Sequence, residues 1–186
     1  TDDTDVVLKP QVAKAASAQA SNLAAWYAKK KTAMFTAIAQ VEKDLKYGDE
    51  TAKAEEALRM LGSLIGLETA RPDKRGKGAG PDVLWMGDSG PAAWGFELKT
   101  NKKKDGEYSK ADIGQCHNHE EWLHDSRGET SEIAIVGRFL PVSKLANPSE
   151  QLQVIELEGF RDMLHRVKVT LHPSATDSVG SGGSWP

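Results

Sequence analysis

Two carboxylates and a lysine are spaced along the chain in a pattern that suits a divalent cation. Asp82 follows a Gly-Pro pair and precedes an apolar stretch, and in the next apolar stretch one residue separates Glu97 from Lys99. If the two stretches form a hairpin that turns about Ser89, position 82 lies opposite position 96 or 97, and the two carboxylates meet at one end of the hairpin. Mg²⁺ prefers oxygen ligands and takes one or two protein carboxylates. The spacing therefore predicts a site for Mg²⁺ or Mn²⁺, in which Lys99 orients a water molecule or stabilises charge on a phosphate.

A solvated hairpin end with a surface ion pair is the ordinary explanation of the same pattern. Another acid-x-lysine triplet occurs at 44–46, in a helical setting, so the triplet alone is weak evidence. The surroundings favour the metal site, because apolar strands flank both carboxylates and a polar helix follows directly.

The elements that must position these residues follow from the hydrophobic periodicity. An amphipathic stretch without Gly or Pro predicts one long helix or a helical hairpin over 11–47. We expect further helices at about 50–64, 109–124 and 159–167, strands at 83–86, 92–99, 132–137 and 153–157, and a loop over 69–81. This order predicts an α/β fold with a mixed β-sheet of four or five strands flanked by helices.

Basic residues gather in two loops, one on each side of the proposed site in the sequence. Their candidate members for nucleic-acid binding are Arg75 and Lys77 in the first loop and Lys102, Lys103, Lys104 and Lys110 in the second. A cationic rim around a carboxylate pocket is what a phosphodiester substrate requires, because phosphate contacts dominate its affinity. Lysines that only keep exposed loops soluble are the ordinary alternative.

The composition excludes several classes of protein. The 186 residues carry a formal net charge of −3, so the overall charge does not indicate a nucleic-acid binder. The single cysteine, Cys116, excludes a disulfide framework and a multi-cysteine zinc site. No stretch approaches the ~20 apolar residues of a membrane span, and nothing at the start resembles a signal peptide. We therefore expect a cytoplasmic protein with no membrane partner.

The segment 80–85, Gly-Pro-Asp-Val-Leu-Trp, followed by Glu97-Leu98-Lys99, resembles the PD-(D/E)XK nuclease superfamily, whose members have the restriction-endonuclease-like fold. The resemblance covers about residues 50–170. It implies a nuclease that depends on Mg²⁺ or Mn²⁺ and hydrolyses phosphodiester bonds of DNA. Asp82 and Glu97 would bind the metal, with the carbonyl of Leu98 as a further ligand, and Lys99 would assist the attacking water.

The resemblance also implies residues on the helices before and after the hairpin. Glu56 stands where the family often has an acidic residue, with the adjacent Glu55 as the second choice. Gln115 matches a glutamine that some members carry on the following helix, although His119 stands where they have an aromatic residue. Exposed glutamates and a solvated helix face would be the ordinary explanations. Domains of this kind often act in DNA repair, restriction or phage defence.

The resemblance leaves the N-terminal segment unexplained. We expect a helical extension over 1–47, a nuclease-like domain over 48–172 and a flexible tail over 173–186. A helix of such length cannot bury its whole apolar stripe, which includes Met34 and Phe35, against residues 50–170. The stripe therefore predicts self-association or docking to a larger protein, and a helical hairpin packed within a monomer is the alternative.

The second hypothesis for the whole chain comes from another class of function. It is a catalytically inactive nucleic-acid-binding or assembly module with the same fold, which would bind without metal-dependent cleavage.

Overall fold

The computed structural model describes residues 19–25, 28, 31–75, 80–87 and 93–171. Its helices are α2 (Lys31–Asp44), α3 (Thr51–Leu64), α4 (Pro72–Arg75), α5 (Lys110–Arg127) and α6 (Leu157–Leu171). Its strands are β1 (Glu68–Ala70), β2 (Val83–Met86), β3 (Trp94–Leu98), β4 (Glu132–Val136) and β5 (Gln153–Ile155). The predicted α/β class and the mixed sheet are confirmed.

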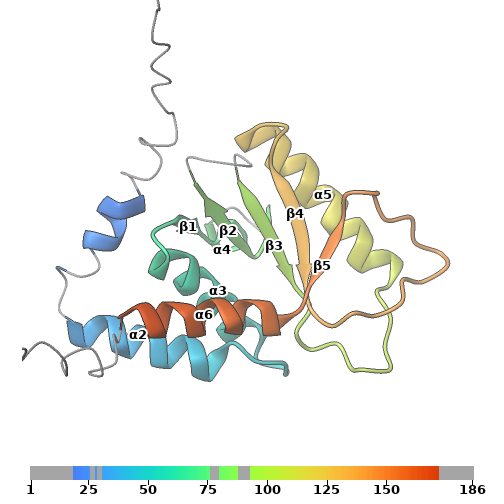
Figure 1. Ribbon diagram of the computed structural model, residues 1–186. Helices are drawn as coiled ribbons and strands as arrows, with labels where there is room; N and C mark the ends of the chain where they lie inside the picture. The colour runs from blue at the N-terminus through green and yellow to red at the C-terminus, as the bar shows by residue number, and fades with distance from the viewer. Residues whose placement is uncertain (1–18, 26–27, 29–30, 76–79, 88–92, 172–186) are drawn as a thin grey trace, which may run out of the picture.

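The five strands lie in the sheet in their sequence order (Figure 1). β1, β2 and β3 are antiparallel neighbours, whereas β4 runs parallel to both β3 and β5. A tight turn suffices between antiparallel strands, but two parallel neighbours need a crossover, and α5 provides it between β3 and β4. The hairpin and the crossover helix are therefore built next to each other.

Helices cover both faces of the sheet (Figure 1). One face packs on α2, α3 and α6 in the larger hydrophobic cluster, which includes Phe96 and Leu98 of β3. The other face packs on α5, and there a Cβ on Gly95 would lie 2.5 Å from Leu123. Because side chains alternate along a strand, Glu97 shares the face of Gly95 and points toward α5.

The segment 69–81 is not a loop throughout, so this prediction is wrong in part. β1 begins at Glu68 and pairs with β2, and α4 follows it directly. These elements have three and four residues. A segment that short shows no periodicity, so neither element could be predicted from the hydrophobic pattern.

The α2 helix packs within the main core. Its residues Met34, Ile38 and Val41 are buried in the same hydrophobic cluster as residues of α3 and α6, and Phe35 packs against that cluster. The expectation that Met34 and Phe35 require a partner from outside this core is therefore wrong. The remaining large residues of that stripe, at 26 and 27, lie outside the described residues, as do 1–18 and the expected tail at 173–186.

None of the helices in the described part of the chain combines the length and apolar character that crossing a bilayer requires.

The burial of α2 predicts that Val41→Ala lowers the free energy of unfolding by about 2 kcal/mol, because truncation leaves a cavity in a packed core. Val41 is 0% exposed, whereas Val169 on α6 is 59% exposed. Val169→Ala is therefore the matched control, since both substitutions make the same exchange in a helix, and we expect a change within about 0.5 kcal/mol. Urea denaturation of the full chain measures both values. Equal small changes would show that α2 contributes little to the core.

Candidate functional site

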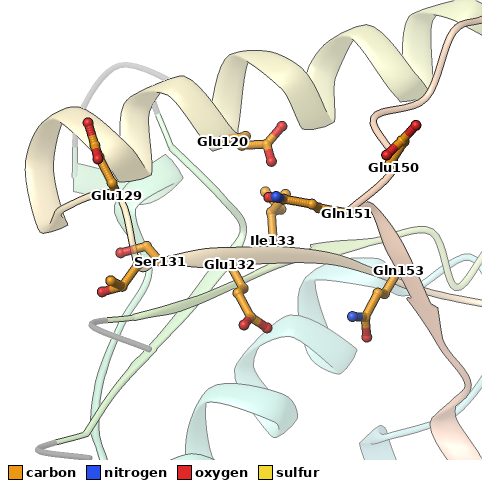
Figure 2. Close-up of a pocket in the computed structure, with 9 residues that line it drawn as sticks. Glu120, Glu129, Ser131, Glu132, Ile133, Glu150, Gln151 and Gln153 are labelled. Carbon is orange, nitrogen blue, oxygen red and sulfur yellow. The ribbon is translucent and has the colours of Figure 1, made fainter. Parts of the chain in front are cut away.

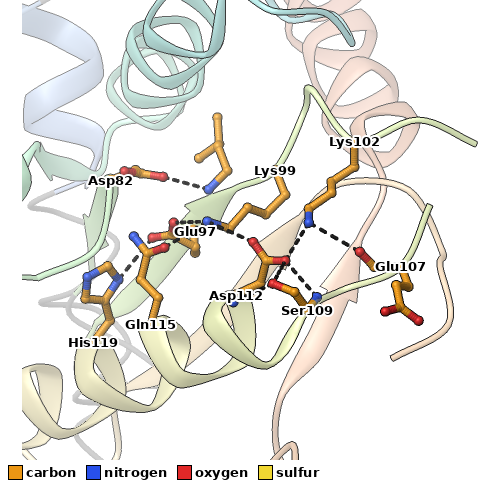
Figure 3. Close-up of polar contacts among 10 residues, drawn as sticks. Asp82, Glu97, Lys99, Lys102, Glu107, Ser109, Asp112, Gln115 and His119 are labelled. Atoms are coloured by element: carbon orange, nitrogen blue, oxygen red, sulfur yellow. Dashed lines mark hydrogen bonds and ion pairs between the residues drawn. The ribbon is translucent and has the colours of Figure 1, made fainter. Parts of the chain in front are cut away.

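The end of the β2–β3 hairpin brings Asp82 and Glu97 together, as the spacing predicts. Val83 pairs with Phe96, so Asp82, one residue before β2, lies across from Glu97 near the end of β3. The Oδ2 atom of Asp82 accepts a hydrogen bond of 2.8 Å from the backbone N–H of Leu98 (Figure 3). The hydrogen bond fixes the Asp82 carboxylate against the strand that carries Glu97.

Glu97 is buried, with 2% of its surface exposed. Its Oε1 atom lies 2.9 Å from Nζ of Lys99. Its Oε2 atom lies 3.0 Å from Nδ1 of His119, but the two atoms are not aligned as a hydrogen bond, and neither has a hydrogen-bond partner among the described residues. A solvated hairpin end therefore does not describe Glu97.

Lys99 is the cation at the centre of this site (Figure 3). Besides Glu97, its Nζ donates a hydrogen bond of 2.8 Å to Oε1 of Gln115 and lies 3.5 Å from Oδ1 of Asp112. Burial lowers the pKa of Lys99, but the Glu97 carboxylate outweighs that effect, so the pKa lies above its ordinary value. Lys99 is therefore an ammonium ion at neutral pH and acts as a cation rather than as a proton acceptor.

Asp82 holds its proton unusually well. Burial raises its pKa, the nearby Glu97 charge raises it further, and the Leu98 N–H lowers it only in part, so that the pKa is about 6. Two carboxylates that share a site repel each other, and a cation between them relieves the repulsion.

Asp112 connects Lys99 to the start of α5, and sequence analysis missed it. Asp112 and Ser109 form a capping box, in which each side chain accepts a hydrogen bond from the backbone of the other. Burial raises the pKa of Asp112, but hydrogen bonds from Lys102 and Ser109 outweigh it and lower the pKa to about 2. The Ser-x-x-Asp spacing, a capping signal, was visible in the sequence.

The α3 helix directs Glu55, not Glu56, toward the site. Glu55 is 8% exposed, and its carboxylate oxygen lies within 4.8 Å of oxygens of Asp82 and Asp73. The side chain of Glu56 is 44% exposed and pairs with Arg59. The choice of Glu56 from the sequence is therefore corrected to its neighbour, and Asp73 on α4 is an addition that sequence analysis missed.

Arg71 is the counter-ion of this second acidic group. Its guanidinium pairs with Glu55 and lies 3.9 Å from Oδ2 of Asp73, and its side chain is mostly buried. Arg71 therefore belongs to the interior of the site and not to a cationic rim.

The residues present fit a hard divalent cation. Asp82 and Glu97 supply carboxylate oxygens, and the buried Oε2 of Glu97 has no hydrogen bond within the described part of the chain. Oxygen donors of this kind, few in number and from carboxylates, are what Mg²⁺ takes from proteins. The Leu98 carbonyl remains a predicted further ligand.

The predicted basic residues divide into two groups. Lys103 and Lys104 are exposed on the segment between β3 and α5, and Lys110 is exposed at the first position of α5. Lys102 instead points inward, where its Nζ binds Oδ2 of Asp112 and the carbonyl of Glu107 (Figure 3). Its first role is thus to hold this segment against α5. The side chain of Arg75 and the whole of Lys77 lie outside the described residues.

An acidic groove lies at the opposite end of the parallel strands. Its cavity of about 630 Å³ is lined by the glutamates at 120, 129, 132 and 150, near the starts of β4 and β5 (Figure 2). Phosphate groups are repelled there, so a nucleic acid would approach the other end of the sheet, where Lys99 lies.

Cys116 is an inert thiol. It is fully buried, and burial raises its pKa to about 12, so the reactive thiolate is not formed at neutral pH. This agrees with its assignment from the sequence to an ordinary buried position.

No protein-family model and no curated protein matches the chain. The resemblance to a nuclease superfamily therefore rests on the residues of the hairpin and its neighbouring helices.

The pKa of Asp82 predicts how stability depends on pH in a metal-free buffer. Folded Asp82 keeps its proton up to about pH 6, whereas an unfolded Asp releases it near pH 4. The folded state thus binds more protons in this window, and its stability falls as the pH rises through it. Asp82→Asn removes this loss and should raise the free energy of unfolding by on the order of 2–3 kcal/mol above pH 7, with a smaller gain near pH 5.

Chemical denaturation in EDTA at both pH values measures the effect, and Asp105→Asn on an exposed turn serves as the matched control. A gain that is absent, or that is the same at both pH values, would contradict the raised pKa of Asp82.

Proposed function

We propose that the chain is a divalent-metal-dependent nuclease domain of the restriction-endonuclease-like type, which hydrolyses phosphodiester bonds of DNA. One observation carries this proposal: two carboxylates meet at the hairpin end, and one of them is fully buried with an oxygen that no hydrogen bond from the described residues satisfies. A buried carboxylate without full compensation is costly, and a metal site is a common reason for it.

In this proposal Asp82 and Glu97 hold Mg²⁺ or Mn²⁺, with the Leu98 carbonyl as a further ligand. The bound ion supplies charge stabilisation at a phosphoryl oxygen and activation of water. Glu55 and Asp73, whose oxygens lie near Asp82, increase the negative potential that attracts the cation.

The positive charge of Lys99 has a separate role. Its raised pKa keeps it protonated, so it stabilises the negative charge that develops on the phosphate and orients the attacking water by donating a hydrogen bond. Gln115 accepts a hydrogen bond from Nζ of Lys99 and Asp112 lies near it, so both limit the positions it can take. The exposed Lys103, Lys104 and Lys110 would contact the DNA backbone. A domain of this kind would serve DNA repair, restriction or phage defence.

Glu97→Gln tests the metal site with a side chain of the same size. Affinity for Mn²⁺, measured by calorimetry, should fall by more than about tenfold, the loss that even an outer partner of a metal ligand causes. Cleavage of plasmid and linear DNA should fall with it. Glu120→Gln, in the acidic groove at the other end of the sheet, is the matched control and should leave both properties unchanged.

Two results would contradict the nuclease proposal. One is unchanged Mn²⁺ affinity in Glu97→Gln. The other is a wild-type chain that binds DNA but cleaves no form of it in Mn²⁺, which would favour the inactive binding module.

Replacement of Lys103 and Lys104 by Ala should weaken DNA binding without changing its sequence preference. Each lost phosphate contact should reduce the slope of log affinity against log salt by about 0.9 on duplex DNA. Lys43→Ala, exposed on α2, is a control that should keep the wild-type slope. Lys102→Ala should mainly lower stability, because Lys102 binds the partly buried Asp112. A double variant with the wild-type slope would exclude both lysines from the DNA contact.

A further inference from the structure

A second groove lies directly beside the proposed metal site. Its cavity of about 470 Å³ runs along α5, and its lining includes Gln115 and His119. Gln115 accepts the hydrogen bond from Lys99, and Nδ1 of His119 lies 3.0 Å from Glu97 (Figure 3). A ligand in this groove would therefore be separated from the proposed metal site only by the side chains of Gln115 and His119.

Among the described residues, the lining of this α5 groove is polar and includes no lysine, arginine or acidic residue. Besides Gln115 and His119, it includes the amide of Asn118 and the indole of Trp122. A phosphate is bound most strongly by cationic donors, and the described lining offers only the neutral N–H donors of its amides and indole besides the imidazole of His119. Amides and aromatic rings instead recognise an unpaired nucleobase, by hydrogen bonds to its edge and by stacking on its face.

Two glycines give the groove its form. Gly80 has a φ of +88°, and a Cβ there would meet Trp122 at 3.0 Å, so the indole packs closely over this turn. Gly114 is different, because a Cβ at this position on α5 would have nothing within 4 Å. Gly114 therefore leaves open space on the helix surface within the groove, at some cost in helix stability.

We propose that the α5 groove binds one unpaired nucleobase next to the scissile phosphodiester bond, so that the substrate is single-stranded at the cleavage site. This inference rests on the proposed nuclease function. A base within a duplex keeps its edge and faces inside the stack and does not reach such a groove unless it is flipped out. The volume of the groove lies within the range of small-ligand pockets and suits one base.

Gly114→Leu places a side chain in the open space of the groove and tests this proposal. Fluorescence anisotropy in EDTA, where cleavage does not occur, gives the dissociation constant of a short labelled single-stranded DNA. The variant should bind it about tenfold or more weakly, the loss expected when a stacked base is displaced. Binding of a blunt duplex of the same sequence should not change. In Mn²⁺, the KM for the single strand should rise, while Mn²⁺ affinity stays at the wild-type value.

Gly159→Leu is the matched control, because Gly159 lies on α6 and a Cβ there also has nothing within 4 Å. It should bind single strands as the wild type does. The proposal is overturned if Gly114→Leu binds single strands as tightly as this control, if it loses single strand and duplex equally, or if the wild type binds no single strand. If Gly114→Leu loses binding but the wild type cleaves nothing, the base-binding groove stands and the nuclease function fails.

Discussion

The arrangement around the candidate site depends on one constraint, the burial of the Glu97 carboxylate. A buried charge is tolerated only when it is paired, and Lys99 is the pairing cation. Lys99 must itself be held on the side of α5, and the helix supplies Gln115 and Asp112 for this purpose. Asp112 also caps the helix, so the start of α5 and the charge balance of β3 depend on the same side chain.

The described residues do not fully compensate the negative charges of Asp82 and Glu97. Incomplete compensation of this kind distinguishes a functional site from an ion pair that only stabilises the fold. Asp82 lies close enough to Glu97 for burial and repulsion to raise its pKa to about 6. Lys99 pairs with Glu97, and Arg71 pairs with Glu55 and lies near Asp73. The remaining repulsion between Asp82 and Glu97 lowers the stability of the metal-free chain, and a bound cation would relieve it. Functional sites often reduce stability in this way.

The parts of the fold that depend on periodicity and spacing could be predicted from the sequence. The α/β class, the helix after the hairpin and the proximity of Asp82 and Glu97 all follow from strand alternation and helix signals. The sequence does not show which side chain of a helix faces the rest of the folded chain. Glu55 and Glu56 are adjacent on α3, and only the packing of that helix decides which one faces the sheet. The stripe of α2 likewise shows that Met34 is buried, but not against which partner.

The distribution of charge along the sheet bears on how a substrate would approach the candidate site. Glutamates line a groove at the starts of β4 and β5, and exposed lysines lie beyond the end of β3. These two sets of charged residues lie at opposite ends of the same parallel strands, and the net charge of the chain is −3. In the proposed function, the exposed lysines would attract a polyanion to the end that holds Glu97 and Lys99. The groove along α5 lies at that end. A uniform cationic surface contacts only the sugar-phosphate backbone of a nucleic acid, whereas this groove would contact a base.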